Sequence, residues 1–216
     1  MSEEELMIQQ LFDEEKLTEK QKKIIIAAIE TFSEKGYAAS STNEIAKKAG
    51  VAEGTIFRHY KTKKDLLMSI VTPLMTRLIA PFIVDDFDKV LNRQYEQVED
   101  FLRAIIENRR GVIKKILPVV KIMLQEIPFQ PELREQFIDL IAKRIFDRVA
   151  NIIEGYQADG QLIEMPPASL ARLAITSILG YLATRYILLP DLDWDDELET
   201  ERTIQFIMNG IGNKKA

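Results

Sequence analysis

Residues 42 to 67 of the chain read TNEIAKKAGVAEGTIFRHYKTKKDLL. Gly50 supplies a turn between two stretches of helix-forming residues, and the small side chains of Ala46 and Ala49 let two helices cross closely. The second stretch, Ala52–Tyr60, presents polar residues while Ile56 faces inward. This order of features predicts a helix-turn-helix, in which the second helix is held out to enter a DNA groove.

Residue pairs with the spacing of helix caps mark where the helices of this region begin. The pairs are Thr18 with Gln21, Ser41 with Glu44, and Thr62 with Asp65. Gly36 can adopt the left-handed conformation that ends the first helix, with Tyr37 packing behind it. The caps therefore predict one helix before the helix-turn-helix and a longer one after it.

The remainder of the chain has the apolar period of helices and no convincing strand. The predicted helices span Asn92–Asn108, Gly111–Glu126, Pro131–Ala158 and Ala168–Leu189, and a last one ends near Gly210. Pro73, Pro81 and the pair Asp85–Asp86 are expected to interrupt or bend the chain between helices. The predicted fold is all-α, with an N-terminal three-helix helix-turn-helix domain and a C-terminal helical bundle.

The composition excludes several classes of protein. A hydrophobic content of 46% excludes a disordered chain. No apolar run reaches the roughly 18 residues that a membrane-spanning helix needs. The N-terminal residues 1–15 are acidic, so we do not expect a secretory signal, and the absence of cysteine fits a reducing compartment. We expect a cytoplasmic protein that does not contact membranes.

Charge is distributed unevenly along the chain. The net charge is −5, yet residues 18–64 hold ten Lys or Arg against five Asp or Glu, which leaves about −10 for the rest. A basic block in an acidic chain is typical of a polyanion-binding module joined to a module with another task. We therefore predict an acidic N-terminal extension over 1–17, a DNA-binding domain over 18–64, and an effector-binding and dimerisation domain over 65–216.

The candidate DNA contacts lie at the start of the first helix of the motif and along the second. They are Ser41, Thr42, Glu53, Gly54, Thr55, Phe57, Arg58, His59, Lys61 and Lys63. Hydroxyls beside the unpaired N–H groups of a helix start can bind phosphate. Arg58 can bind guanine through two hydrogen bonds, and Thr55 can contact a thymine methyl or a phosphate. The lysines would contact the DNA backbone, which adds affinity but little sequence preference.

Some of these candidates have simpler interpretations. Glu53 is better explained as an exposed residue favoured at a helix start than as a reader of cytosine. The lysines after the second helix could form a merely solvated face. His59 is the only histidine, and without a partner His or Cys it favours neither a metal site nor a catalytic base. We expect no metal, no cofactor and no catalytic residues.

The segment Thr18–Val71 resembles the N-terminal domain of the TetR family of bacterial transcriptional regulators. The resemblance rests on Ile24-Ile25, Ala28, Phe32, Gly36-Tyr37, Thr42, Ile45-Ala46, Ala49-Gly50-Val51, Gly54-Thr55-Ile56-Phe57, His59-Tyr60, Lys63 and Leu66-Leu67. It implies an all-helical homodimer that binds DNA as a transcription regulator, with a small-molecule pocket in the C-terminal bundle.

Three positions depart from the family pattern. Phe57 stands where the family usually has Tyr, so a phenolic hydrogen bond to phosphate is lost. Tyr60 stands where it usually has Phe, which is nearly neutral if the ring packs. Ala52 stands where it often has Ser, so the second helix lacks an N-cap at a cost of about 1 kcal/mol.

The resemblance also places functions in the C-terminal bundle. The candidate pocket residues are Met123, Phe137, Tyr156, Tyr181 and Arg185, although such an apolar stripe is more often core. For Arg185 we favour an ion pair at the surface or interface. The candidate residues of a self-complementary dimer interface are Leu173, Ser177, Gly180, Thr184, Ile204, Ile207 and Met208, although burial against the chain's own core would explain them too.

The sequence thus predicts a repressor that binds a pseudo-palindromic double-stranded operator as a dimer. A small apolar or amphipathic effector would release it by favouring a conformation with the wrong spacing between the recognition helices. Three alternatives stay open: a DNA-binding dimer of this fold without an effector, a helical enzyme, and a helical adaptor that binds only proteins. The enzyme would need a cluster of titratable groups that the sequence does not offer.

Overall fold

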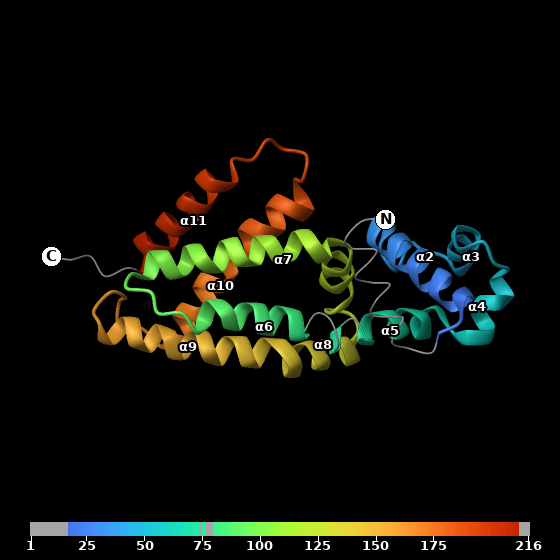
Figure 1. Cartoon of the computed structure of the whole chain (residues 1–216), viewed down its shortest axis with the longest axis horizontal. Coiled ribbons are helices and arrows are strands. Elements are labelled where there is room, and N and C mark those ends of the chain that lie inside the picture. The colour runs from blue at the N-terminus through green and yellow to red at the C-terminus, as the bar shows by residue number, and fades with distance from the viewer. Residues whose placement is uncertain (1–16, 74, 77–79, 212–216) are drawn as a thin grey trace. The chain divides into compact units, whose positions relative to one another are not determined.

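The computed structural model describes residues 17–73, 75–76 and 80–211. For residues 81–83 it describes only the backbone. The described residues fold into helices with no β-strand among them, which confirms the all-α prediction (Figure 1). The predicted acidic extension lies almost wholly outside this part of the chain. Contacts divide the chain into two compact units, one of residues 1–82 and 115–138, the other of 83–114 and 139–216.

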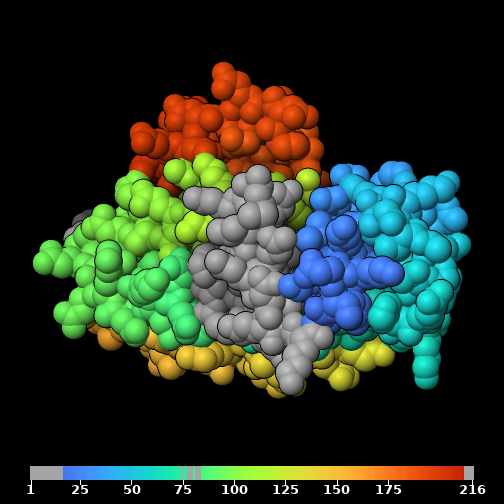
Figure 2. All heavy atoms as spheres, turned by 45° about the vertical axis from the view of Figure 1, so that its right-hand side comes forward, coloured from blue at the N-terminus to red at the C-terminus, as the bar shows by residue number. Residues whose placement is uncertain are grey.

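The first unit contains the predicted helix-turn-helix. Its N-terminal helices are α2 (Glu19–Lys35), α3 (Thr42–Ala49), α4 (Glu53–His59) and α5 (Lys63–Pro73), and α8 (Pro131–Phe137) also belongs to it. Helix α2 packs on α3 and on α5, and α3 packs on α4. Figure 2 shows the side chains of α2 (blue) and of the segments that follow it (cyan) packed against one another.

The predicted caps begin and end these helices. The Thr18 hydroxyl accepts a hydrogen bond from the Gln21 N–H at 3.3 Å, and the Gln21 side chain accepts one from the Thr18 N–H at 3.0 Å, which completes a capping box. Gly36 has a φ of +82° and ends α2, and the Phe32 and Tyr37 rings meet edge to face 5.5 Å apart. The packing of Tyr37 behind the helix end is as predicted, whereas Gly36 has a ψ of 157° and so adopts a positive φ without the left-handed conformation that the sequence predicted.

The turn and the third helix start are also as predicted. Gly50 ends α3 in the left-handed conformation, with φ +69° and ψ +34°. Thr62 and Asp65 each accept a hydrogen bond from the other's backbone N–H at 3.0 Å, so α5 begins with a complete capping box. Ser41 accepts from the Glu44 N–H at 3.1 Å, but the Glu44 carboxylate contacts Lys35 instead of returning to the cap.

A continuous apolar core holds the helix-turn-helix together. Its largest fully buried side chains are Ile24, Ile25, Phe32, Ile45, Ile56, Leu66, Leu67 and Ile70. Burying one such side chain stabilises the fold by about 1.5–3 kcal/mol. Each of α2 to α5 contributes to this set, so the core fixes how the short α4 is presented.

The second unit holds most of the remaining helices. They are α6 (Ala80–Leu91), α7 (Val98–Glu126), η2 (Ile138–Ala142), α9 (Lys143–Ala158), α10 (Pro167–Ala183), η3 (Thr184–Leu188) and α11 (Asp196–Ile211). The ends of α6 and η2 and residues 115–126 of α7 belong to the first unit. Helix α10 packs against both α9 and α11. None of the helices in the described ranges is long and apolar enough to cross a membrane.

Two of the predicted breaks were wrong. Helix α7 runs through Gly111, which is exposed and costs a helix interior only about 1 kcal/mol relative to Ala. Its irregular residue is Ile116, with φ −125° and ψ +26°, two residues before Pro118, because proline lacks an N–H and crowds the preceding turn. Asp86 lies inside α6, where its carboxylate accepts hydrogen bonds from Lys89 and Asn108.

Two π-helical turns also lie where continuous helices were predicted. Five-residue π-helices follow α8 and α10 without leaving the helical path, so the predicted spans 131–158 and 168–189 are helical but not uniformly α. The domain boundary predicted after Lys64 stays a prediction, since the contact units divide the chain at other residues.

Candidate nucleic-acid interface

Helix α4 presents the predicted recognition surface. Arg58 and His59 are exposed, and the Phe57 ring is 47% exposed. Gly54 is exposed, and a Cβ added to it would have no atom within 4 Å, so this turn of the helix offers an open backbone. Ile56 on the opposite side is fully buried and anchors the helix. The arrangement leaves the predicted contact residues of α4 accessible to a groove.

Two of the three departures from the TetR family pattern, Ala52 and Tyr60, lie at the two ends of α4. Ala52 occupies the N-cap position and makes no side-chain capping bond. Tyr60 follows the helix and is buried, as expected for a ring that packs. Thr55 is half-buried, whereas Lys61 is exposed just beyond the helix.

Glu53 and the start of α3 are joined directly. The Thr42 hydroxyl donates a hydrogen bond to Glu53 Oε1 at 2.6 Å, and the Asn43 amide donates to Oε2 at 3.4 Å. The sequence did not single out Asn43, and only its place beside Thr42 at the helix start could have suggested it. The Ser41 hydroxyl caps α3 at the same place. The predicted residues Ser41, Thr42 and Glu53 therefore lie together.

Lys63 has a role that the sequence did not reveal. Its ammonium group donates hydrogen bonds to the carbonyl oxygens of Tyr37 at 2.5 Å and Ser40 at 2.7 Å, and it lies 4.3 Å from the centre of the Tyr37 ring. Burial lowers the pKa of Lys63, and the charge of Glu126 partly opposes that effect. Lys63 thus fastens the loop between α2 and α3 to the start of α5.

The predicted pocket residues are divided between the two units. Met123 and Phe137 belong to the first, and Met123 is buried. Tyr156, Tyr181 and Arg185 belong to the second. Tyr156 packs 5.9 Å from the Phe101 ring and donates a hydrogen bond to a backbone carbonyl at 3.1 Å, so it serves the core.

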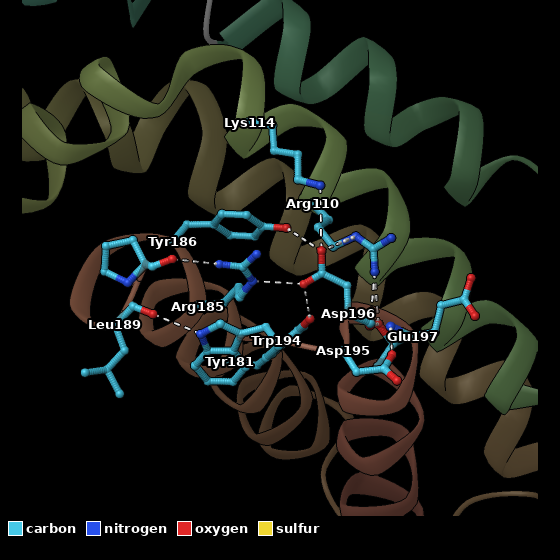
Figure 3. A network of polar contacts seen from close by, with 12 residues as sticks. Arg110, Lys114, Tyr181, Arg185, Tyr186, Leu189, Trp194, Asp195, Asp196 and Glu197 are labelled. Atoms are coloured by element: carbon cyan, nitrogen blue, oxygen red, sulfur yellow. Dashed lines mark hydrogen bonds and ion pairs between the residues drawn. The ribbon is translucent and has the colours of Figure 1, made fainter. Parts of the chain in front are cut away.

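Arg185 forms the ion pair that we favoured for it. Its Nε donates to the carboxylate of Asp196, the first residue of α11, at 3.0 Å (Figure 3). Lys114 Nζ lies 3.7 Å and Arg110 Nε 4.0 Å from the same carboxylate. Burial alone would raise the pKa of Asp196, but the hydrogen bond and charge of Arg185, with the charges of Arg110 and Lys114, lower it.

Aromatic side chains enclose this ion cluster. The hydroxyls of Tyr181 and Tyr186 lie 3.4 Å and 3.5 Å from the Asp196 carboxylate. Burial, with the negative charge of Asp196 beside the ring, raises the pKa of Tyr186 to about 12. The Trp194 indole donates to the Leu189 carbonyl at 2.9 Å. The cluster therefore joins α7, the end of α10 and the start of α11.

A cavity in the second unit lies away from the predicted pocket residues. Its volume is about 280 Å³, and it is lined by Lys89, Val90, Arg93, Tyr95, Ala104, Glu107 and Asn108. The Tyr95 hydroxyl is buried and has no hydrogen-bond partner among the described residues. Ligand pockets for drug-sized molecules are usually about 300–1,000 Å³, so this cavity would suit only a small ligand.

The predicted interface residues differ in exposure. Ile204 and Ile207 are only 3% and 4% exposed within the single chain, whereas Gly180 is exposed. Leu173, Ser177, Thr184 and Met208 are half-buried. The exposed apolar side chains of α10 and α11 that the sequence did not predict include Leu179 and Phe206, at 52% and 72%. Within the described ranges, no group of His, Cys, Asp and Glu could hold a metal ion.

Comparisons with known proteins agree with this geometry. Residues 24–70 match the family model described as bacterial regulatory proteins, tetR family. The fatty acid metabolism regulator protein of Bacillus subtilis (strain 168) is 27% identical over 197 residues, which make up 88% of this chain and 95% of that protein. The HTH-type transcriptional activator FasR of Mycolicibacterium smegmatis is 23% identical, over 90% of this chain and 84% of its own.

A solved structure shows the same fold. The transcriptional regulator FadR from Bacillus subtilis, in complex with stearoyl-CoA, aligns with a TM-score of 0.61 and 23% identity over 88% of this chain and 98% of its own. The exposed α4 on its packed scaffold, together with these relatives, defines a helix-turn-helix DNA-binding transcriptional regulator. Residues 24–70 therefore resemble the DNA-binding domain of the tetR family of bacterial regulatory proteins.

Proposed function

We propose that the protein is a homodimeric repressor whose two α4 helices enter successive major grooves of a pseudo-palindromic operator. The observation that carries this proposal is the exposure of Arg58, His59 and Phe57 on a helix anchored by the buried Ile56. Half-sites one helical turn of DNA apart would match the two-fold symmetry of such a dimer. In this role residues 18–64 bind DNA, and residues 65–216 bind the effector and the second copy.

The proposed contacts divide by function. Arg58 would read guanine and Thr55 a thymine methyl, which gives sequence preference. Lys61 and the hydroxyls of Ser41 and Thr42 would contact phosphates, which gives affinity. Phe57 would make apolar contact with the backbone. Lys63 would support these contacts mainly by holding the α2–α3 loop, because its ammonium group already bonds two carbonyls.

Helices α10 and α11 are the proposed dimer interface. Exposed apolar side chains on both helices, among them Leu179 and Phe206, offer a surface that a second copy could bury. Gly180, Thr184 and Met208 would allow close approach of the partner's helices. Ile204 and Ile207 would support this surface from within the chain, since both are buried there.

A fatty acyl derivative is the proposed class of effector. The support comes from the comparisons: a curated relative is described as a fatty acid metabolism regulator, and a solved structure of similar fold is described as a complex with stearoyl-CoA. Met123 and Phe137 of the first unit and Tyr181 of the second remain separate candidate pocket residues, whereas Tyr156 serves the core and Arg185 is engaged by Asp196. The effector would release DNA only if it binds the DNA-free conformation better than the DNA-bound one. The role would be cytoplasmic and would not include catalysis.

A gel-shift experiment with DNA from beside the protein's own gene tests the proposal. We expect the parent to shift one fragment at a concentration that leaves unrelated DNA free, and a long-chain acyl-CoA to abolish the shift. Binding that no acyl-CoA or other screened ligand changes would favour the same fold without an effector. A complex strengthened by acyl-CoA would contradict release, and no binding to any DNA would contradict the proposed function as a whole.

A further inference from the structure

The Glu53 carboxylate connects the starts of the two helices of the helix-turn-helix. Glu53 is the first residue of α4, and its oxygens accept hydrogen bonds from Thr42 and Asn43, the first two residues of α3. The Thr42 bond is the shorter, at 2.6 Å, and it is partly buried. In the DNA-free protein the Thr42 hydroxyl is therefore already committed to an anion of the chain itself.

A threonine hydroxyl can donate only one hydrogen bond at a time. The Thr42 hydroxyl is also the group that we propose donates to a DNA phosphate, so phosphate binding there requires the bond to Glu53 to break. The approaching phosphate would also meet the negative charge of Glu53, and like charges at short distance repel. Both effects make DNA binding less favourable.

Among the described residues, Glu53 differs from neighbouring carboxylates, whose negative charges are each paired with a lysine. Glu44 contacts Lys35, and Glu30 and Glu34 share Lys48 at 3.0 Å and 3.2 Å. Within the described part of the chain, the hydrogen bonds of the Glu53 side chain come from neutral donors, a hydroxyl and an amide. The negative charge of Glu53 therefore stays at the face that would meet DNA.

We propose that Glu53 competes with DNA phosphate for the Thr42 hydroxyl and so limits the affinity of the protein for DNA of any sequence. Glu53 acts here as a positioning residue, through Thr42, and the inference rests on the proposed DNA-binding role of this face. It replaces the two interpretations available from the sequence, a solvated helix-start residue and a reader of cytosine.

The test compares Glu53→Ala with the control Glu44→Ala in the full chain. Both variants remove one negative charge from the helix-turn-helix, but only the first releases Thr42. The control is stringent because losing Glu44 also frees Lys35 to attract DNA. Binding is measured by fluorescence anisotropy with a labelled random-sequence duplex. We expect Glu53→Ala to bind about fivefold more tightly than the parent, the net scale of one ordinary hydrogen bond, and Glu44→Ala to change affinity less than about twofold.

A second pair of variants isolates the Thr42 hydroxyl. Thr42→Val keeps the shape of the side chain and removes the donor. In the Thr42→Val background, the gain from Glu53→Ala should be smaller than in the parent background, because only the repulsion by the Glu53 charge is then removed and there is no hydroxyl left to release. Glu53→Gln, which keeps a weaker, neutral acceptor, should give a gain smaller than that of Glu53→Ala.

Other outcomes overturn the inference in distinguishable ways. A Glu53→Ala gain of undiminished size without the Thr42 hydroxyl would mean that charge alone acts. Weaker binding by folded Glu53→Ala and Glu53→Gln would mean that Glu53 contacts DNA or holds α3 and α4 together. Thermal unfolding of each variant checks the fold. A parent that binds no DNA would overturn the proposed function and this inference with it.

Discussion

Two groups of cationic side chains in this protein are arranged in opposite ways. On and beside α4, Arg58 and Lys61 are exposed to solvent. In the second unit, Arg110, Lys114 and Arg185 converge on the single carboxylate of Asp196 (Figure 3). Cations of the first kind are available to a polyanion, whereas those of the second kind hold helices of the chain together. The partners of a cation, rather than its presence, therefore indicate its function.

Lys63 shows why this distinction needs the structure. In the sequence it belongs to the same basic run as Lys61, and a phosphate contact was predicted for both. In the fold its ammonium group bonds the carbonyls of Tyr37 and Ser40, so it resembles the cations around Asp196 more than its neighbour. The comparison can be tested by removing members of each group.

The largest expected effect is that of Arg58→Ala on operator binding. Losing a two-bond contact with guanine should weaken operator binding by about 1–3 kcal/mol, or roughly 5- to 150-fold, and should change binding to random DNA much less. Anisotropy titrations with both duplexes measure the two affinities. Equal losses on both duplexes would mean that Arg58 contacts only the backbone.

The next effect is the stability loss of Asp196→Asn. Removing this charge leaves three half-buried or exposed cations close together, and we expect a loss of about 1–2 kcal/mol in the free energy of unfolding. Chemical denaturation at neutral pH measures it. Asp193→Asn, at an exposed position in the loop just before α11, is the control and should change stability by less than about 0.5 kcal/mol.

The stability difference between the parent and Asp196→Asn should also depend on pH. The pKa of Asp196 is lower in the folded protein than in the unfolded chain, so its stabilising effect is present above the unfolded pKa and is lost as pH falls through the folded pKa. The gap in stability between parent and Asp196→Asn should therefore close below about pH 4. A gap that stayed constant down to pH 2 would contradict the ion cluster as its cause.

The Lys61→Ala and Lys63→Ala pair should separate binding from stability. Lys61→Ala should reduce the slope of log affinity against log salt by about 1 and leave the unfolding free energy nearly unchanged. Lys63→Ala should cost about 1 kcal/mol of stability, because two carbonyls lose a charged donor. The comparison fails if Lys61→Ala is the destabilising member of the pair.

The smallest expected effect is a gain in stability. Ala52→Ser should supply the missing N-cap of α4 and raise the unfolding free energy by about 0.5–1 kcal/mol. Thermal unfolding of the variant and the parent measures it. An unchanged transition would show that another group already satisfies the start of α4.

The helix-turn-helix was predictable because its helix ends are determined locally. Thr18, Gly36, Gly50 and Thr62 cap or end helices in the structure as the sequence indicated. The C-terminal bundle was less predictable, because packing overrides local signals there. Helix α7 continues through Gly111, and α8 and α10 each continue into a five-residue π-helix.

The residue types of the candidate site were predictable from the sequence, but the hydrogen-bond partners of those residues were not. The positions of Arg58 and His59 on an exposed helix face follow from the apolar period that buries Ile56. The bond between Thr42 and Glu53 joins residues eleven positions apart across a turn, and no local rule specifies it. Likewise, the sequence could not show that Ile204 and Ile207 point into the chain's own core while Phe206 is exposed.

Selection of bound sequences from random double-stranded DNA tests the central claim most directly, with the parent and Arg58→Ala treated alike. We predict that the parent enriches one pseudo-palindromic sequence with a guanine at matching positions of both half-sites, and that Arg58→Ala relaxes the preference at those positions. Enrichment of no sequence by the parent, or of the same sequence with equal strength by the variant, would contradict the assignment of α4 as the helix that reads DNA.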